Sequence, residues 1–213
     1  MESPAQSAQT PPSDQTRLRQ ENALLADELL SLRHFVRSLQ DLADAADRRA
    51  GPTDTMELLR QILASALAAI GAEDGSLLVT DEESGELVFV LAHGKISQDD
   101  LFGVRVPRGE GIAGWVAERG EPTIVEDARA DARFYPAIDE AFGFETRSLL
   151  CAPITGGSRV LGVVEIVNKE RARSFSPDDL ALVSLLCRFA GELLHSTEQR
   201  LATERMRASD SSG

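Results

Sequence analysis

The first third of the chain carries a hydrophobic repeat of seven residues. Leucine returns at every seventh position from residue 18 to residue 39, and a second set of mostly apolar positions lies three or four residues away. This spacing is typical of the a and d positions of a coiled coil. It predicts a coiled-coil helix over residues 16–50, preceded by a Pro-, Ser- and Gln-rich lead-in, residues 1–15, that we expect to be disordered. The residues of this seam are Leu18, Asn22, Leu25, Leu29, Leu32, Val36 and Leu39.

The polar member of the seam indicates how two such helices would pair. Asn22 stands at an a position, where asparagine favours a parallel, in-register dimer at some cost in stability. In that orientation Glu28 of one helix would face Arg33 of its partner. We therefore expect a homodimer through the seam. The alternative is an amphipathic helix folded back on its own domain, although so narrow an apolar stripe favours the coiled coil.

After Gly51-Pro52 the pattern changes to that of a mixed domain. One stretch has apolar residues at helical spacing, and two pairs of short apolar runs are each joined by a turn-rich segment, which is typical of hairpins. The last helix begins at Ser176-Pro177, a capping residue followed by a proline suited to the first turn. The expected elements are a helix from Thr53 or Asp54 to about Ile70, strands over 76–80, 87–92, 104–106, 123–125, 148–154 and 160–167, a short helix over 112–119, and the final helix.

This order of elements predicts the fold class. A helix, a hairpin, several short elements, a second hairpin and a long helix indicate an α+β domain with an antiparallel sheet flanked by helices. A parallel doubly wound sheet is excluded, because strands and helices do not alternate along the chain. We expect the domain to occupy residues 53–196, and residues 197–213 to form the end of the helix and a disordered tail.

Charge narrows the range of partners. The chain has 213 residues, with 22 Lys and Arg against 35 Asp and Glu, and a formal net charge of −13. A nucleic-acid binder needs a basic face, and so does a protein that binds an anionic membrane surface, so we expect neither partner. The N-terminus resembles no secretion signal, and no apolar run approaches the roughly 18 residues of a membrane span, so we expect a cytoplasmic protein.

Catalytic motifs are absent from the sequence. The three histidines are scattered, the two cysteines lie 36 positions apart, and no nucleophile or metal-binding spacing occurs, so we predict no catalytic residue and no metal. Residues 109–114 read G-x-G-x-x-G, but Pro107-Arg108 interrupts the approach and the following helix ends by Gly120. We interpret this segment as a turn that leads into a helix. A nucleotide- or redox-dependent enzyme is the remaining alternative.

One charged residue is unusual for its position. Glu165 lies within the otherwise apolar strand 160–167, where a buried carboxylate costs free energy unless it is paired. Two interpretations stay open. The side chain either faces outward from an edge strand or lines a ligand pocket.

Taken in order, the motifs resemble the GAF domain of signalling proteins over about Thr53 to Leu194. Each is short, but their order and spacing together are specific. The resemblance implies a GAF fold, akin to the PAS fold, with a pocket between the sheet and residues 102–144. It suggests Trp115, Phe134, Tyr135 and Glu165 as the pocket lining. The matching segments are Arg108 to Ala117, Asp127, Asp131, Arg133-Phe134, Arg147 to Ile154, Gly162 to Lys169 and Phe175 to Leu180.

Part of a ligand-site signature is also present. Some cyclic-nucleotide-binding GAF domains carry N-K…F-x3-D-E, and this chain has Asn168, Lys169, Phe175 and Asp179, with Leu180 in place of the glutamate. The resemblance implies that Lys169 and Asp179 pair to support the site. It makes a cyclic nucleotide the candidate ligand, although the missing glutamate counts against it. The cysteines of the sulfoxide-reductase members and the Cys-His pair of the bilin-binding members are lacking.

These observations predict a non-enzymatic, dimeric GAF sensor module. A small molecule would bias the long helices, and a signalling partner protein would read the change, since no output domain is recognisable in the sequence. A ligand-free dimeric interaction scaffold is the alternative.

Overall fold

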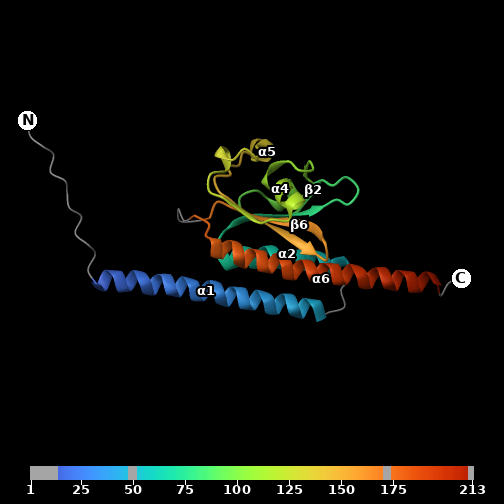
Figure 1. Cartoon of the computed structure of the whole chain (residues 1–213), viewed down its shortest axis with the longest axis horizontal. Helices are drawn as coiled ribbons and strands as arrows, with labels where there is room; N and C mark the ends of the chain where they lie inside the picture. The colour runs from blue at the N-terminus through green and yellow to red at the C-terminus, as the bar shows by residue number, and fades with distance from the viewer. Residues whose placement is uncertain (1–13, 48–51, 170–173, 211–213) are drawn as a thin grey trace, which may run out of the picture.

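The computed structural model describes residues 14–47, 52–169 and 174–210 (Figure 1). The first helix, α1 (Asp14–Asp47), is followed by α2 (Pro52–Ile70), and a long C-terminal helix, α6 (Pro177–Asp210), closes the chain. The prediction for the lead-in falls almost entirely outside the described residues. Helix α6 extends to Asp210, so most of residues 197–213, the segment expected to hold the helix end and a disordered tail, is helical.

Six strands form one antiparallel sheet, which confirms the predicted fold class. The sheet has the order β3-β2-β1-β6-β5-β4, so the two hairpins lie side by side and β6 is a central strand paired with β1 and β5. The strands are β1 (Asp74–Thr80), β2 (Leu87–His93), β3 (Arg105–Val106), β4 (Thr123–Val125), β5 (Leu149–Gly156) and β6 (Arg159–Val167).

Long helices cover one face of the sheet. Because successive strand residues point to opposite faces, Leu77 packs toward α2 and α6 while Leu78 packs toward the other face. Ile62 of α2 and Leu186 of α6 are fully buried against the sheet. Figure 1 shows both helices running along this side of the domain. This helical face forms the larger of the two cores.

Short elements cover the opposite face. They are α3 (Gln98–Leu101), α4 (Gly111–Arg119), the 3-10 turn η1 (Ala128–Ala130) and α5 (Ala137–Phe142). Ile112 and Val116 of α4 are buried with Phe89 and Leu149 of the sheet in a second core. Of these covering elements, the sequence predicted only α4. This face holds the candidate site.

Helix α6 contacts β5 backbone to backbone. A Cβ atom placed on Gly191 of α6 would lie 2.1 Å from the carbonyl oxygen of Thr155, and one on Gly156 would lie 2.5 Å from the carbonyl oxygen of Gly191. Only glycine permits this approach. Among the described residues, one helical stretch, Pro177–Arg200, has the length and composition of a membrane span. A helix that buries one face on a sheet has the same composition.

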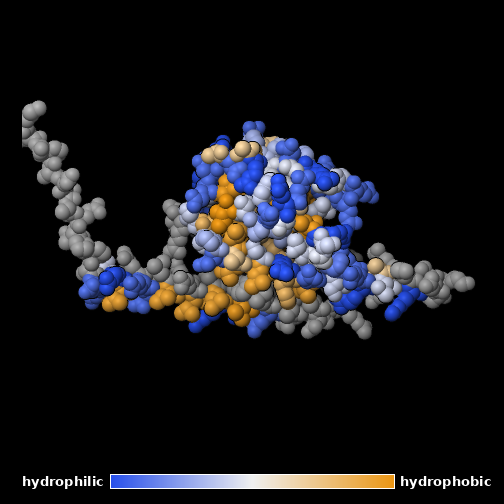
Figure 2. All heavy atoms as spheres, viewed as in Figure 1, coloured by the Kyte–Doolittle hydropathy of each residue, from blue (hydrophilic) through white to orange (hydrophobic). Residues whose placement is uncertain are grey.

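Helix α1 lies alongside α2 and also contacts α6, yet its seam is exposed. The seam side chains that the structure describes include five apolar ones, each about half exposed, and Asn22 is exposed as well. Figure 2 shows apolar side chains along this helix. Helix α1 therefore contacts its own domain while the seam stays exposed. The five are Leu18, Leu25, Leu29, Leu32 and Val36, and the side chain of Leu39 is outside the described set.

Candidate functional site

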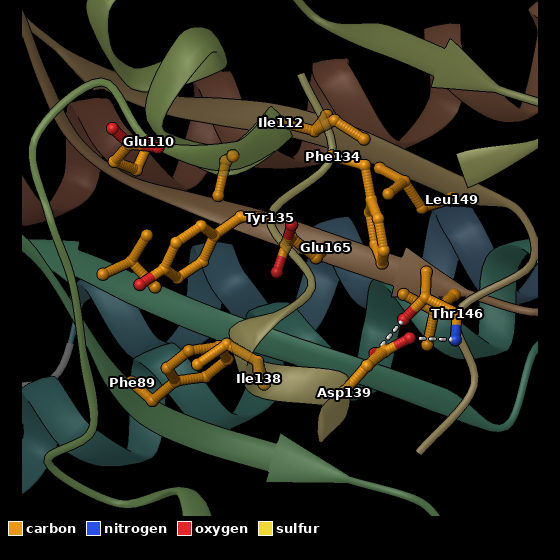
Figure 3. A pocket seen from close by; sticks show the side chains of 14 residues that line it. Phe89, Glu110, Ile112, Phe134, Tyr135, Ile138, Asp139, Thr146, Leu149 and Glu165 are labelled. Atoms are coloured by element: carbon orange, nitrogen blue, oxygen red, sulfur yellow. Dashed lines mark hydrogen bonds between the residues drawn. The ribbon is translucent and has the colours of Figure 1, made fainter. Parts of the chain in front are cut away.

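A hollow lies between the sheet and the short helices (Figure 3). Strands β2 and β6 form its floor, the start of α4 forms one wall, and the segment that leads into α5 forms another. Most lining residues are apolar, and a few polar groups converge on the space, which is the usual composition of a small-molecule pocket. The lining includes Phe89, Val106, Glu110, Ile112, Phe134, Tyr135, Ile138, Asp139, Thr146, Leu149, Glu165 and Val167.

The glycine-rich segment 109–114 shapes the wall at α4. Gly109 and Gly111 have φ angles of 75° and 73°, in the left-handed region that favours glycine. A Cβ on Gly114 would lie 2.7 Å from the backbone of Gly109, so the chain folds tightly over the first turn of α4. The interpretation of this segment as a turn leading into a helix agrees with the structure. Glu110 precedes the helix, and its side chain makes no capping hydrogen bond.

Arg133 anchors the aromatic wall. Its guanidinium donates hydrogen bonds of 2.9 and 2.7 Å to the two carboxylate oxygens of Asp131, and it stacks 4.6 Å from the centre of the Trp115 ring. This ion pair raises the pKa of Arg133 and lowers that of Asp131. Phe134 and Tyr135 follow directly and line the hollow. Trp115 lies outside this lining, because its ring covers Arg133.

Asp139 ties α5 to the start of β5. Its carboxylate is buried and accepts hydrogen bonds of 2.8 Å from both the backbone N–H and the hydroxyl of Thr146. Arg129, an exposed side chain, approaches the same carboxylate at 3.7 Å. Both Asp139 and Thr146 face the hollow, as Figure 3 shows.

Glu165 lies on the floor of the hollow, in the middle of the sheet. Its neighbours across the strands are Ser76 of β1 and Cys151 of β5, so the edge-strand interpretation is wrong. The Ser76 hydroxyl donates a hydrogen bond of 3.4 Å to the carboxylate. Burial raises the pKa of Glu165 to about 7, and the negative charge of Asp139 adds to this effect. A carboxylate in such a setting marks a functional-site candidate.

A second hollow adjoins the first and shares some of its lining, including Phe89, Asp139 and Glu165. It extends toward β1 and the end of β2, where Asp74, His93 and Lys95 line it. The Lys95 ammonium lies 3.8 Å from the Asp74 carboxylate, which also accepts the Lys95 backbone N–H at 2.8 Å. Six residues line both hollows, Glu165 among them, and we refer to the two hollows together as the bilobed cavity and to each as a lobe.

The asparagine of the signature is structural. Asn168 has a φ angle of 53°, a conformation that asparagine tolerates better than most residues. Its side-chain oxygen accepts the backbone N–H groups of Arg147 and Ser148 at 2.8 and 3.4 Å, and its amide donates to the carbonyl of Glu145 at 2.8 Å. Asn168 thus fixes the chain just before β5.

The remaining signature residues also lie away from the hollows. Lys169 forms an ion pair with Asp179, as the resemblance implied, and both side chains are largely buried. Asp179 accepts the Ser176 backbone N–H at 2.7 Å, while the Ser176 hydroxyl accepts the Asp179 N–H at 3.1 Å, which is a reciprocal cap at the start of α6. Phe175 is buried in the core beneath α6.

We expect Asp179→Ala to lower the free energy of unfolding by about 2–3 kcal/mol, because it removes the cap and leaves Lys169 partly buried without its partner. Asp178→Ala is the matched control, since Asp178 is an exposed acid of the same helical turn and should cost only about 0.5 kcal/mol. Urea unfolding measures both. Equal losses in the two variants would contradict the structural role of the pair.

Three lining residues had no signal in the sequence. Phe89, Asp139 and Thr146 carry no motif. Phe89 lies within β2, Thr146 lies in the segment before β5, and Asp139 lies on α5, a short helix that the apolar pattern did not predict. Among the described residues, no group of three or more His, Cys, Asp or Glu side chains is arranged to hold a metal ion. Cys151 and Cys187 are buried, and burial raises the pKa of both thiols.

Comparison with known proteins agrees with this architecture. The sequence profile of the GAF domain matches residues 54–194. The GAF domain of a phosphoenolpyruvate-protein phosphotransferase from Coxiella burnetii superposes with a TM-score of 0.67 at 23% identity, over 82% of this chain and 98% of that one. The free methionine-R-sulfoxide reductase of Neisseria meningitidis, solved with its substrate, superposes with a TM-score of 0.61 at 20% identity, over 76% and 89%. These likenesses show the fold.

Curated relatives include cyclic-nucleotide phosphodiesterases. The dual 3',5'-cyclic-AMP and -GMP phosphodiesterase 11 of Drosophila melanogaster is 45% identical over 89 residues, 41% of this chain and 6% of that protein. The probable 3',5'-cyclic phosphodiesterase pde-5 of Caenorhabditis elegans is 29% identical over 134 residues, 59% of this chain and 18% of that protein. The chain therefore spans less than a fifth of the length of either relative.

Proposed function

Because the chain belongs to the GAF domain family, we propose that it is a non-enzymatic sensor module whose bilobed cavity binds a small molecule. The observation that carries this proposal is Glu165, a carboxylate placed on a central strand at the floor of an open cavity. A purely structural domain gains nothing from a charge at this point. Open space remains between the lining side chains, and this supports a sensor over a ligand-free scaffold.

A thermal-shift panel tests small-molecule binding. It should contain cyclic AMP, cyclic GMP, cyclic dinucleotides, nucleosides and small amines. The phosphodiesterase relatives suggest the cyclic nucleotides, and the carboxylates that line the cavity suggest the amines. A ligand at 100 times its Kd should add about 2.7 kcal/mol, or roughly 5–10 °C for a domain of this size. If binding produced the shift, nitrogen-15 NMR would place the perturbed amides around the cavity. Perturbation confined to other faces would contradict the proposal.

We propose that signal output uses a homodimer through the exposed seam of α1, with a partner protein reading the geometry of α1 and α6. The seam supplies five half-exposed apolar side chains on one helix, which is an apolar surface that a second copy would cover. Helix α6, which packs on the sheet, extends the same helical layer toward the C-terminus.

The dimer is tested by charge placed in the seam. We expect the double variant Leu25→Glu and Leu32→Glu to be monomeric at micromolar concentration, because it places four carboxylates in one short interface. Ala23→Glu with Leu30→Glu is the matched control, since both residues are exposed on α1 but lie outside the seam. Sedimentation velocity distinguishes the states. A wild-type protein that is monomeric, or a seam variant that dimerises as the control does, would contradict the proposal.

A further inference from the structure

The charges that face the cavity are not balanced. Three carboxylates, those of Glu110, Asp139 and Glu165, are among the fourteen residues that line the first lobe, and none of those fourteen is a lysine, arginine or histidine. In the second lobe the basic residues are His93 and Lys95, and Lys95 already lies beside Asp74. An anion that entered the first lobe would therefore lie beside carboxylates, with no basic residue in the lining to pair with it.

Glu165 is the carboxylate that lacks a counter-charge. Asp139 has both oxygens occupied by Thr146 and has Arg129 at 3.7 Å, and Glu110 is exposed at the rim. Among the described contacts of Glu165, the single hydrogen bond comes from the neutral hydroxyl of Ser76, at the long distance of 3.4 Å. Its carboxylate is thus free to receive a donor from a ligand.

Aromatic rings surround this carboxylate. Phe89, Phe134 and Tyr135 line the first lobe, and Figure 3 shows Glu165 rising from β6 toward the space that these rings border. The faces of aromatic rings attract cations, and ring-lined sites with an acid nearby are suited to ammonium groups. The same rings provide apolar area for a ring or short chain attached to the ammonium.

We infer that the ligand is an organic ammonium compound with an apolar or aromatic body, whose charged nitrogen pairs with Glu165 between the rings, and not an anionic nucleotide. This inference rests on the proposed function and specifies the class of ligand. It runs against the cyclic nucleotide that the partial signature suggested, and it agrees with the absence of the signature's glutamate at Leu180.

Affinity should depend on pH in a direction set by Glu165. The titratable and charged groups near this carboxylate are Cys151 on β5, Tyr135 and Glu110 in the segments before α5 and α4, Asp139 on α5, and Asp74, His93 and Lys95 around the second lobe. Protonation of Glu165 below its raised pKa of about 7 removes the counter-charge of the ammonium. Amine affinity should therefore fall by up to about tenfold per pH unit below 7.

Three probes that share one ring and differ in charge test the inference on the full chain: phenethylamine, 2-phenylethanol and 3-phenylpropionate. At pH 8 we expect phenethylamine to bind at least about tenfold more tightly than 3-phenylpropionate, with perturbed amides around the cavity. Glu165→Gln should abolish the preference, while Glu192→Gln, at an exposed acid on α6, should leave it unchanged. Titrations followed by nitrogen-15 NMR give both the affinities and the site.

The outcomes separate the two proposals. Tighter binding of 3-phenylpropionate or cyclic AMP in the cavity, or a preference for the amine that survives in Glu165→Gln, would overturn the ammonium inference and leave the cavity a ligand site. If neither these probes nor the cyclic nucleotides perturbed the cavity at millimolar concentration, the sensor function itself would be wrong.

Discussion

Replacing Glu165 by glutamine is expected to stabilise the protein at pH 8 by about 2–3 kcal/mol. The folded-state pKa of this carboxyl is about 7, against an ordinary value of 4.5, because burial opposes its charged form. A carboxyl with a raised pKa keeps its proton in the folded protein after the unfolded chain has lost its own. The stabilisation that this carboxyl contributes is therefore fully present below about pH 4.5 and is lost as the pH rises through about 7. At about 1.36 kcal/mol per pKa unit, the difference between 4.5 and about 7 corresponds to a loss of about 3 kcal/mol.

Glutamine is a suitable replacement because it is neutral, nearly the same shape, and able to accept the Ser76 hydrogen bond. Urea unfolding of both proteins at several pH values between 4.5 and 8 gives the difference between their free energies of unfolding as a curve against pH. The contributions of the other titrating groups cancel in this difference. The curve should be near zero at the acid end and rise through neutral pH. Glu192→Gln, on the exposed side of α6, should give a flat difference. A flat curve for Glu165→Gln would contradict the assigned burial of the carboxylate.

The substitution Gly191→Ala should lower the free energy of unfolding by about 2–4 kcal/mol, although alanine favours a helix by about 1 kcal/mol over glycine. The added methyl group would lie 2.1 Å from the carbonyl oxygen of Thr155 and 2.4 Å from its carbon. Both are backbone atoms of β5, so no side-chain rotation relieves the contact. Helix α6 must move outward and loosen the core around Leu186 and Ala190.

The control is Ser196→Ala, at an exposed position of the same helix, which gains helix propensity without meeting any neighbour. Circular dichroism during thermal and urea unfolding should show Gly191→Ala melting well below the wild type and Ser196→Ala within about 0.5 kcal/mol of it. If both variants were equally stable, α6 would not be held against β5 as the structure places it.

The two results bear on function in different ways. Gly191 allows the close contact that holds α6 on the sheet. Its replacement would uncouple α6 from β5, the strand next to β6, which carries Glu165. Glu165 is a residue that lowers stability at neutral pH. Residues of this kind are retained where binding or catalysis needs them, so a stabilised Glu165→Gln protein that has lost ligand affinity is the pattern that we expect of a sensor site.

Local patterns in the sequence were sufficient for most elements of the fold. The seven-residue repeat indicated α1, the paired apolar runs joined by turn-rich segments indicated the hairpins, and Ser176-Pro177 marked the start of α6. These features depend on residues a few positions apart, and helical or strand periodicity reports such neighbours directly. The acid in an apolar strand was likewise visible as an anomaly.

The composition of the cavity was decided by tertiary structure alone. Ser76 and Glu165 are 89 positions apart and meet because β1 pairs with β6, a register that no short-range pattern specifies. The short helix that carries Asp139 has too few residues for a periodic signal. The ring of Trp115 stacks against Arg133, a contact that depends on how the two segments pack. The sequence by itself determined the long helices, α4, the strands and the resemblance to the GAF domain. Which side chains share the cavity, and that Glu165 lacks a cation there, follow from long-range packing, because contacts between distant segments are set only when the whole sheet assembles.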